Sequence, residues 1–169
     1  MNVELLFFLV VAIVAVLSAI AMITRPNPVM SVLFLIVNFF CLALLYLLLQ
    51  AQFVAVIQIL VYAGAIMVLF LFVIMLLNLG DEQHITEKLS GKKILAIVLA
   101  SATFIEILLG VSVHACLPTS PSPVVASMGT VQGIGKILFT DYLVPFEATS
   151  ILLLAAMVGV LVLAKKKFG

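Results

Sequence analysis

Residues 53–79 read FVAVIQILVYAGAIMVLFLFVIMLLNL, an apolar run without a charged side chain. A run of about 27 residues forms an ideal helix about 40 Å long, whereas the hydrocarbon core of a bilayer is only about 30 Å thick. This stretch therefore predicts a transmembrane helix that tilts, protrudes or departs from regular helical geometry.

Four more apolar runs flank this stretch, at about residues 3–23, 29–49, 94–115 and 146–164. Hydrophobic residues make up 66% of the chain and charged residues 9%, with a mean hydropathy of +1.46. These values exclude a soluble globular domain. We predict an all-α integral membrane protein with five transmembrane helices, in which residues 1–169 form a single membrane domain surrounded by the lipid bilayer and other membrane helices.

The basic residues are distributed unequally between the two sides of such a bundle. Lys136 is alone on one side, and the other side holds seven of the eight: Arg25, Lys88, Lys92, Lys93, Lys165, Lys166 and Lys167. The positive-inside rule then places the N-terminus outside and the C-terminus in the cytoplasm. Residues 80–93 become a cytoplasmic loop and residues 116–145 a periplasmic loop, in which Gly129 to Phe139 can form a weak helix along the membrane surface.

Several classes of function find no support in the sequence. The net charge of +1 is too small to indicate a nucleic-acid partner. Cys41 and Cys116 form no CxxC pair, and His84 and His114 are isolated, so no metal site is predicted. We find no glycine-rich phosphate loop, dinucleotide fingerprint or nucleophile-base arrangement. We therefore expect no cofactor and no catalytic site on this chain.

Two acidic residues are candidates for proton transfer. Glu106 lies near the middle of the fourth span, where an ionised carboxylate costs about 2.5 kcal/mol or more, and Thr103 and His114 share its helical face. It is either a proton-exchanging group or a neutral acid satisfied by a neighbouring helix. Glu147 follows Pro145 at the start of the last span, where helix capping alone would explain both residues.

The third span contains a different signal, Gln58 and Tyr62 followed by Ala63, Gly64 and Ala65. At α-helical spacing Tyr62 lies one turn after Gln58 on the same face, and both side chains need hydrogen-bond partners in lipid. Three small residues allow another backbone to approach closely and make a local break in helical geometry less costly. The residues alone are compatible with tight packing or with a π-bulge.

The segment 61–70, VYAGAIMVLF, closely resembles the family of subunit J of bacterial NADH:quinone oxidoreductase, respiratory complex I, whose mitochondrial counterpart is the sixth mitochondrially encoded subunit. The resemblance extends in order along nearly the whole chain, with further matches at residues 27–29, 78–80 and 138–147. It implies a membrane-arm subunit without redox groups in the bacterial inner (cytoplasmic) membrane. Its expected neighbours are subunits A, H, K and N, and NADH, FMN, iron–sulfur clusters and quinone belong to other chains of the complex.

The resemblance also implies a coupling mechanism. In this family the third span carries a π-bulge at the segment matching Tyr62 to Ala65, and its conversion to regular helix is linked to a water path for protons. We therefore expect a conformational gate that couples quinone reduction to proton pumping at Gln58, Tyr62, Ala63, Gly64 and Ala65. Some relatives have glutamate at the position of Gln58, and Glu106 matches no motif of the family.

Three other functions stay open at this point. One is the equivalent subunit of a related complex with a different electron donor, because the electron-input module is on other chains. Another is a stand-alone proton-coupled carrier that uses Glu106, although the sequence lacks the inverted repeats that mark many carriers. A purely structural membrane scaffold is a third reading.

Overall fold

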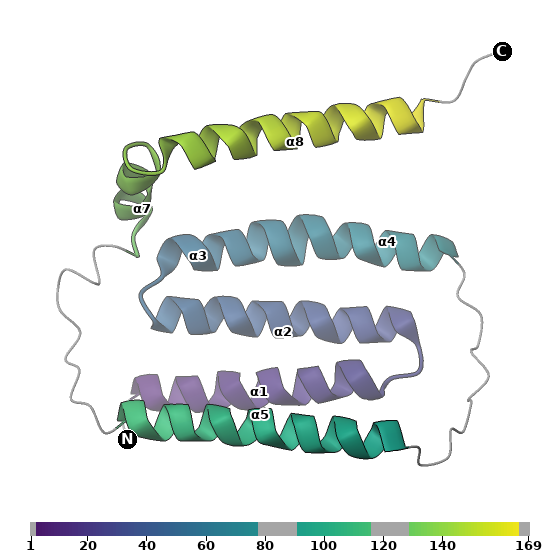
Figure 1. Cartoon of the computed structure of the whole chain (residues 1–169), viewed down its shortest axis with the longest axis vertical. Helices are drawn as coiled ribbons and strands as arrows, with labels where there is room; N and C mark the ends of the chain where they lie inside the picture. Colours follow the sequence, from purple (N-terminus) through teal and green to yellow (C-terminus); the bar gives the residue numbers. More distant parts are fainter. Residues whose placement is uncertain (1–2, 78–90, 116–128, 166–169) are drawn as a thin grey trace.

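The computed structural model describes residues 3–77, 91–115 and 129–165. Its helices are α1 (Val3–Thr24), α2 (Pro28–Leu48), α3 (Gln52–Ile57), the π-helix η1 (Gln58–Ile66), α4 (Met67–Leu77), α5 (Gly91–Ala115), α7 (Val131–Leu138) and α8 (Leu143–Ala164). The segments α3, η1 and α4 follow one another without a break and form one long helix (Figure 1). Within the described ranges, five helices are long and apolar enough to cross a membrane. The prediction of five membrane helices is confirmed.

Two of the spanning helices begin three residues earlier than their apolar runs, α5 at Gly91 and α8 at Leu143. Lysine can remain in a helix near the headgroups because its apolar stem lies along the helix while its ammonium group reaches water. Proline is tolerated at Pro145 because the first N–H groups of a helix have no partner inside it. The rest of the predicted cytoplasmic loop, residues 80–90, lies outside the described residues.

Polar side chains tie α1 to α2 within the apolar part of their hairpin. The Asn38 side-chain amide donates to the Ala15 carbonyl oxygen at 2.8 Å and to the Ser18 hydroxyl at 3.2 Å. Nearer the turn, the Ser31 hydroxyl donates to the Met22 carbonyl oxygen. Hydrogen bonds between membrane helices contribute about 0.6 kcal/mol each. Their main effect here is to set the register of the two antiparallel helices.

The turn after α2 is a Schellman motif. Gln50 has a φ of 61°, in the left-handed region. The Gln50 N–H donates to the Leu47 carbonyl oxygen and the Ala51 N–H donates to the Tyr46 carbonyl oxygen, both at 3.0 Å, which is the hydrogen-bond pair of this motif. The turn reverses the chain, so α3 starts antiparallel to α2.

Gly129, which precedes α7, lies directly against this turn. Its carbonyl oxygen accepts a hydrogen bond from the Phe53 N–H at 3.3 Å, a donor at the start of α3 that has no partner inside its own helix. A Cβ at Gly129 would overlap the Gln50 carbonyl oxygen and come within 3.3 Å of the Ala51 Cα. The two backbones can approach this closely only because residue 129 is glycine.

Three of the five spans pack together, whereas the described side chains of α5 and α8 stay largely exposed. α2 lies between α1 and the long third helix (Figure 1). In contrast, no described side chain of α5 between residues 95 and 112 is buried, and none of α8 is buried. Most exposed side chains of both helices are apolar, as expected for helices that contact lipid or other proteins in a membrane.

Candidate functional site

The third span contains a π-helix of nine residues, η1. The Met67 N–H at its end donates to the Tyr62 carbonyl oxygen, five residues back, and also to the Gly64 carbonyl oxygen. A regular α-helix would direct each N–H to the carbonyl four residues back. π-helices are rare and occur mostly as single-turn bulges at functional sites. η1 is longer than the single-turn bulge that the family resemblance implies.

Gly64 lies where the widened helix brings its backbone close to the preceding turn. A Cβ at Gly64 would lie 3.2 Å from the Ile59 carbonyl oxygen, closer than an ordinary van der Waals contact of about 3.5 Å. Glycine avoids this crowding in the π form, and it costs a regular α-helix about 1 kcal/mol relative to alanine. Gly64 therefore narrows the free-energy gap between π-helical and α-helical geometry.

The π-helix also changes which residues face α2. The buried side chains of the third span are Ala55, Gln58, Ala63 and Met67, so the buried face advances by five residues between Gln58 and Ala63. The sequence predicts that Tyr62 shares the face of Gln58, at the three- or four-residue spacing of an α-helix. The structure buries Gln58 and leaves the Tyr62 side chain 45% exposed. Within η1 the next buried side chain after Gln58 is that of Ala63, five residues on.

Tyr62 stays at the edge of the interface with α2. Its ring meets the Phe39 ring edge-on, with centroids 5.8 Å apart and an interplanar angle of 70°. Of the other predicted gate residues, Gln58 is 7% exposed, Gly64 is half-buried and Ala65 is exposed. In the part of the chain that the structure describes, neither the Gln58 amide nor the Tyr62 hydroxyl makes a hydrogen bond to another residue.

The structure does not bring the acidic candidates to this site. Glu106 lies on α5 and Glu147 on α8, and both side chains are exposed, on helices with no buried side chain among their described residues. The Thr103 hydroxyl donates to the Leu99 carbonyl oxygen of its own helix at 3.0 Å. The side chain of His114 lies outside the described residues.

Glu147 is the fifth residue of α8 and no acidic residue lies in the first turn of that helix. The helix dipole acts mainly within the first turn. Capping is therefore a weaker explanation for this carboxylate than its sequence position indicates.

Residues 3–77, 91–115 and 129–165 contain no group of three or more His, Cys, Asp or Glu side chains arranged to hold a metal ion. Cys41 is buried on α2, and Cys116 lies outside these ranges.

Two features of the site could not be found from local sequence patterns. One is the docking of Gly129 on the turn before α3, which joins residues far apart in the chain. The other is the hydrogen bonding of Asn38 to α1, which fixes the helix that η1 packs against. A polar residue in the middle of an apolar span was the only signal for Asn38.

Comparison with known proteins gives consistent matches over most of the chain. A family model described as NADH-ubiquinone/plastoquinone oxidoreductase chain 6 matches residues 18–163. NAD(P)H-quinone oxidoreductase chain 6 of Leptolyngbya boryana is 40% identical over 168 residues, covering 99% of this chain and 82% of the relative. NADH-quinone oxidoreductase subunit J of Rickettsia felis is 33% identical over 165 residues, covering 96% and 80%. The chloroplastic subunit 6 of Physcomitrium patens is 39% identical over 170 residues, covering 97% and 84%.

Proposed function

Because the chain belongs to the family of NADH-ubiquinone/plastoquinone oxidoreductase chain 6, we propose that it is a membrane-arm subunit of a proton-translocating NADH:quinone oxidoreductase. It carries no redox centre and no catalytic site of its own. Its part in the reaction is to couple quinone reduction, which takes place on other subunits, to proton movement through the membrane.

The observation that carries this proposal is the π-helix at Gln58–Ile66 in the middle of a 26-residue span. A π-helix can convert to an α-helix locally, because each N–H can exchange its carbonyl partner while the rest of the helix stays intact. Gly64 keeps the two geometries close in free energy, as the spacing to Ile59 indicates. η1 is therefore the bistable element that the complex biases during turnover.

The two geometries differ in the polarity of the surface that faces α2. In the π form Ala63 lies one turn after buried Gln58. In a regular α-helix Tyr62 takes that place, since four residues make about one turn. The change replaces a methyl group with a phenol beside the Gln58 amide. Two polar side chains one turn apart hold a chain of water molecules better than one, and this is how the gate opens a proton path.

The proposed setting is a cytoplasmic membrane with the N-terminus outside and the C-terminus inside. The expected neighbours are the subunits corresponding to A, H, K and N of the bacterial complex. The unpartnered surfaces of α5 and α8 support this, because a helix without contacts in its own chain gains packing only from other proteins or lipid.

Orientation can be tested at the two ends of α8. In a variant without Cys41 and Cys116, cysteines introduced at Thr140 and Lys165 are expected to react from opposite sides of intact cells. A membrane-impermeant maleimide added outside should label position 140 and reach position 165 only after permeabilisation. The physical reason is that most basic residues lie on the side of Lys165. Labelling of position 165 in intact cells would contradict this orientation.

Glu106 is proposed to exchange protons within the complex. Glu106→Gln keeps the size and much of the hydrogen bonding but cannot release a proton. We expect the proton-to-electron ratio or the pumping rate to fall about twofold or more in the assembled complex, measured in inverted vesicles. Ser112→Ala is the control, because the Ser112 hydroxyl is already bonded to the Leu108 carbonyl oxygen of the same helix. Equal pumping in both variants would leave Glu106 as a structural acid.

The names of the relatives give NADH in some cases and NAD(P)H, meaning NADH or NADPH, in others. The higher identity is to a chain 6 of the NAD(P)H type, at 40%, against 33% to a subunit J. This supports, as a second candidate, the equivalent subunit of a complex with a donor other than NADH.

Purification distinguishes these possibilities. An affinity-tagged chain extracted in mild detergent is expected to bring many subunits and quinone reductase activity with it, since α5 and α8 pack only outside the chain. The donor that drives quinone reduction in this preparation identifies the complex. A stand-alone carrier would instead run as a small homo-oligomer, and that result would overturn the proposed function.

A further inference from the structure

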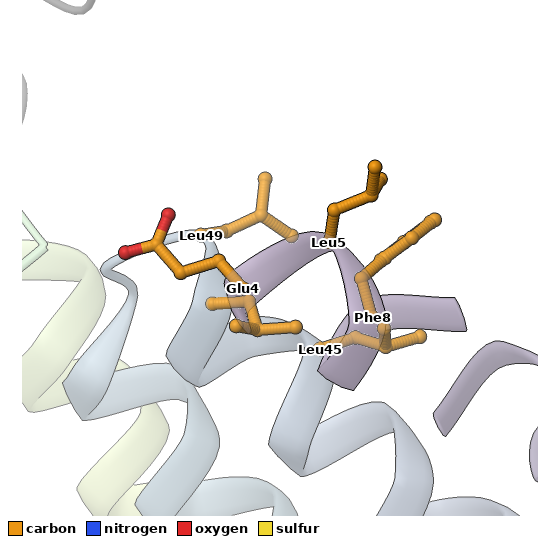
Figure 2. A pocket seen from close by; sticks show the side chains of 6 residues that line it. Glu4, Leu5, Phe8, Leu45 and Leu49 are labelled. Atoms are coloured by element: carbon orange, nitrogen blue, oxygen red, sulfur yellow. The ribbon is translucent and has the colours of Figure 1, made fainter. Parts of the chain in front are cut away.

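The hairpin of α1 and α2 has a groove at the end where α1 begins and α2 ends. Its volume is about 480 Å³, within the range of about 300–1,000 Å³ that is typical of ligand pockets. The lining residues are Glu4, Leu5, Phe8, Leu45, Leu48 and Leu49. Figure 2 shows the Glu4 carboxylate on one side, close to Leu49, with Leu5 and Phe8 on the other. None of the residues that line this groove belongs to η1.

The lining restricts what the groove can hold. Every lining side chain except Glu4 is a leucine or a phenylalanine, and these provide no hydrogen-bond donor or acceptor. The part of an occupant that lies among them must therefore be hydrocarbon, because a polar group would lose its water without gaining a partner. Phe8 is 45% exposed and Leu49 is 72% exposed, so this apolar surface is open from the side.

The carboxylate of Glu4 is complementary to a cation. Glu4 lies in the first turn of α1, and its side chain is exposed. Among the described residues it makes no ion pair. An ammonium group that can donate hydrogen bonds to a carboxylate is the complementary partner.

The Glu4 carboxylate and the apolar lining of the groove lie at different depths in the membrane. α1 has 22 residues, so it is about as long as the hydrocarbon core is thick and its first turn lies at the headgroup level. Phe8 and Leu45 lie about one turn deeper. The occupant therefore has a cation at the membrane surface and hydrocarbon beneath it.

We propose that this groove binds a phospholipid with a primary ammonium headgroup, of the phosphatidylethanolamine type. Its ammonium group pairs with Glu4, and one acyl chain lies along Phe8, Leu45 and Leu48. This lipid site does not depend on the proposed function, since it uses neither η1 nor the acidic residues of α5 and α8.

The test extracts the assembled complex with its surrounding lipid in polymer-bounded discs and quantifies the retained lipids by mass spectrometry. Glu4→Gln is expected to lower the ratio of retained phosphatidylethanolamine to phosphatidylglycerol about threefold, the range for an ion pair near a surface. Glu4→Lys should reverse the preference. Leu48→Trp should lower retention of the lipid by filling the groove, whereas Leu47→Trp, one position along and outside the lining, should not.

A second measurement uses the unaltered complex, so it does not depend on the assembly of any variant. Photoactivatable phosphatidylethanolamine is expected to form adducts with peptides that contain residues 3–8 or 45–49, and phosphatidylglycerol with the same reactive group should form few. An unchanged lipid ratio in Glu4→Gln, or equal labelling by the two probes, overturns the proposal. Cross-linking of residue 49 to another protein instead of lipid would also overturn it, because a partner helix would then fill the groove.

Discussion

Gly64→Val is expected to reduce quinone-linked proton pumping at least about fivefold. The Cβ alone would lie 3.2 Å from the Ile59 carbonyl oxygen, and the two methyl groups of valine add to this crowding. Overpacking of this kind costs about 1–3 kcal/mol. A cost of that size changes the balance between two local geometries by about 5–150-fold, so the variant is held away from the π form and the gate loses one of its two states.

Three activities of the assembled complex measure this effect. Reduction of a water-soluble acceptor by NADH should be unchanged, because electron entry lies on other subunits. Quinone reductase activity and proton pumping should decrease together. Gly64→Ala should give a smaller loss, since its single Cβ needs a shift of only a few tenths of an ångström.

Gly159→Val provides the matched control for this series. It makes the same change in α8, where an added Cβ meets no atom of the chain within 4 Å. Normal pumping by Gly64→Val at normal assembly would exclude a gate at η1. Failure of Gly64→Val alone to assemble would favour tight packing as the role of Ala63, Gly64 and Ala65.

Gly129→Ala is expected to lower both the amount of assembled complex and its resistance to heat. The new methyl group would overlap the Gln50 carbonyl oxygen, which is backbone and cannot move aside as a flexible side chain can. The segment before α7 must then separate from the turn, and the Phe53 N–H loses its partner. We expect a cost of about 1–3 kcal/mol from the overlap and about 1 kcal/mol from the lost hydrogen bond.

The control for this variant lies six residues further along. Gly135→Ala introduces the same methyl group into α7 at a position where nothing lies within 4 Å, and alanine favours the helix by about 1 kcal/mol. The midpoint temperature of quinone reductase inactivation in membranes should fall by several degrees for Gly129→Ala and should not fall for Gly135→Ala. Equal midpoints would show that the contact with Gln50 does not hold the third span.

The sequence predicts the five spans well because each is a continuous apolar run, and lipid imposes that pattern locally. The predicted spans 3–23 and 29–49 agree within a residue or two with α1 and α2. The predicted and observed bounds differ mainly where α5 and α8 begin, because lysine and proline are tolerated in the first turn of a helix. Orientation stays a prediction that rests on the distribution of charge.

The functional face of the third span could not be predicted in the same way. Assigning Tyr62 to the face of Gln58 required the helical period to be known, and η1 changes that period at these two residues. Small residues at 63–65 indicated that a break was possible without saying which residue would turn inward. The contact of Gly129 with Gln50 depends on the tertiary fold, and no local pattern contains it.

The exposed apolar surfaces of α5 and α8 affect how long the chain persists in the cell. A copy synthesised without its partners would leave the apolar side chains of both helices uncovered by protein, and its folded state would gain stability by mass action with the other subunits. The lifetime of the chain should therefore follow the supply of its partners, so we expect copies in excess of them to be short-lived.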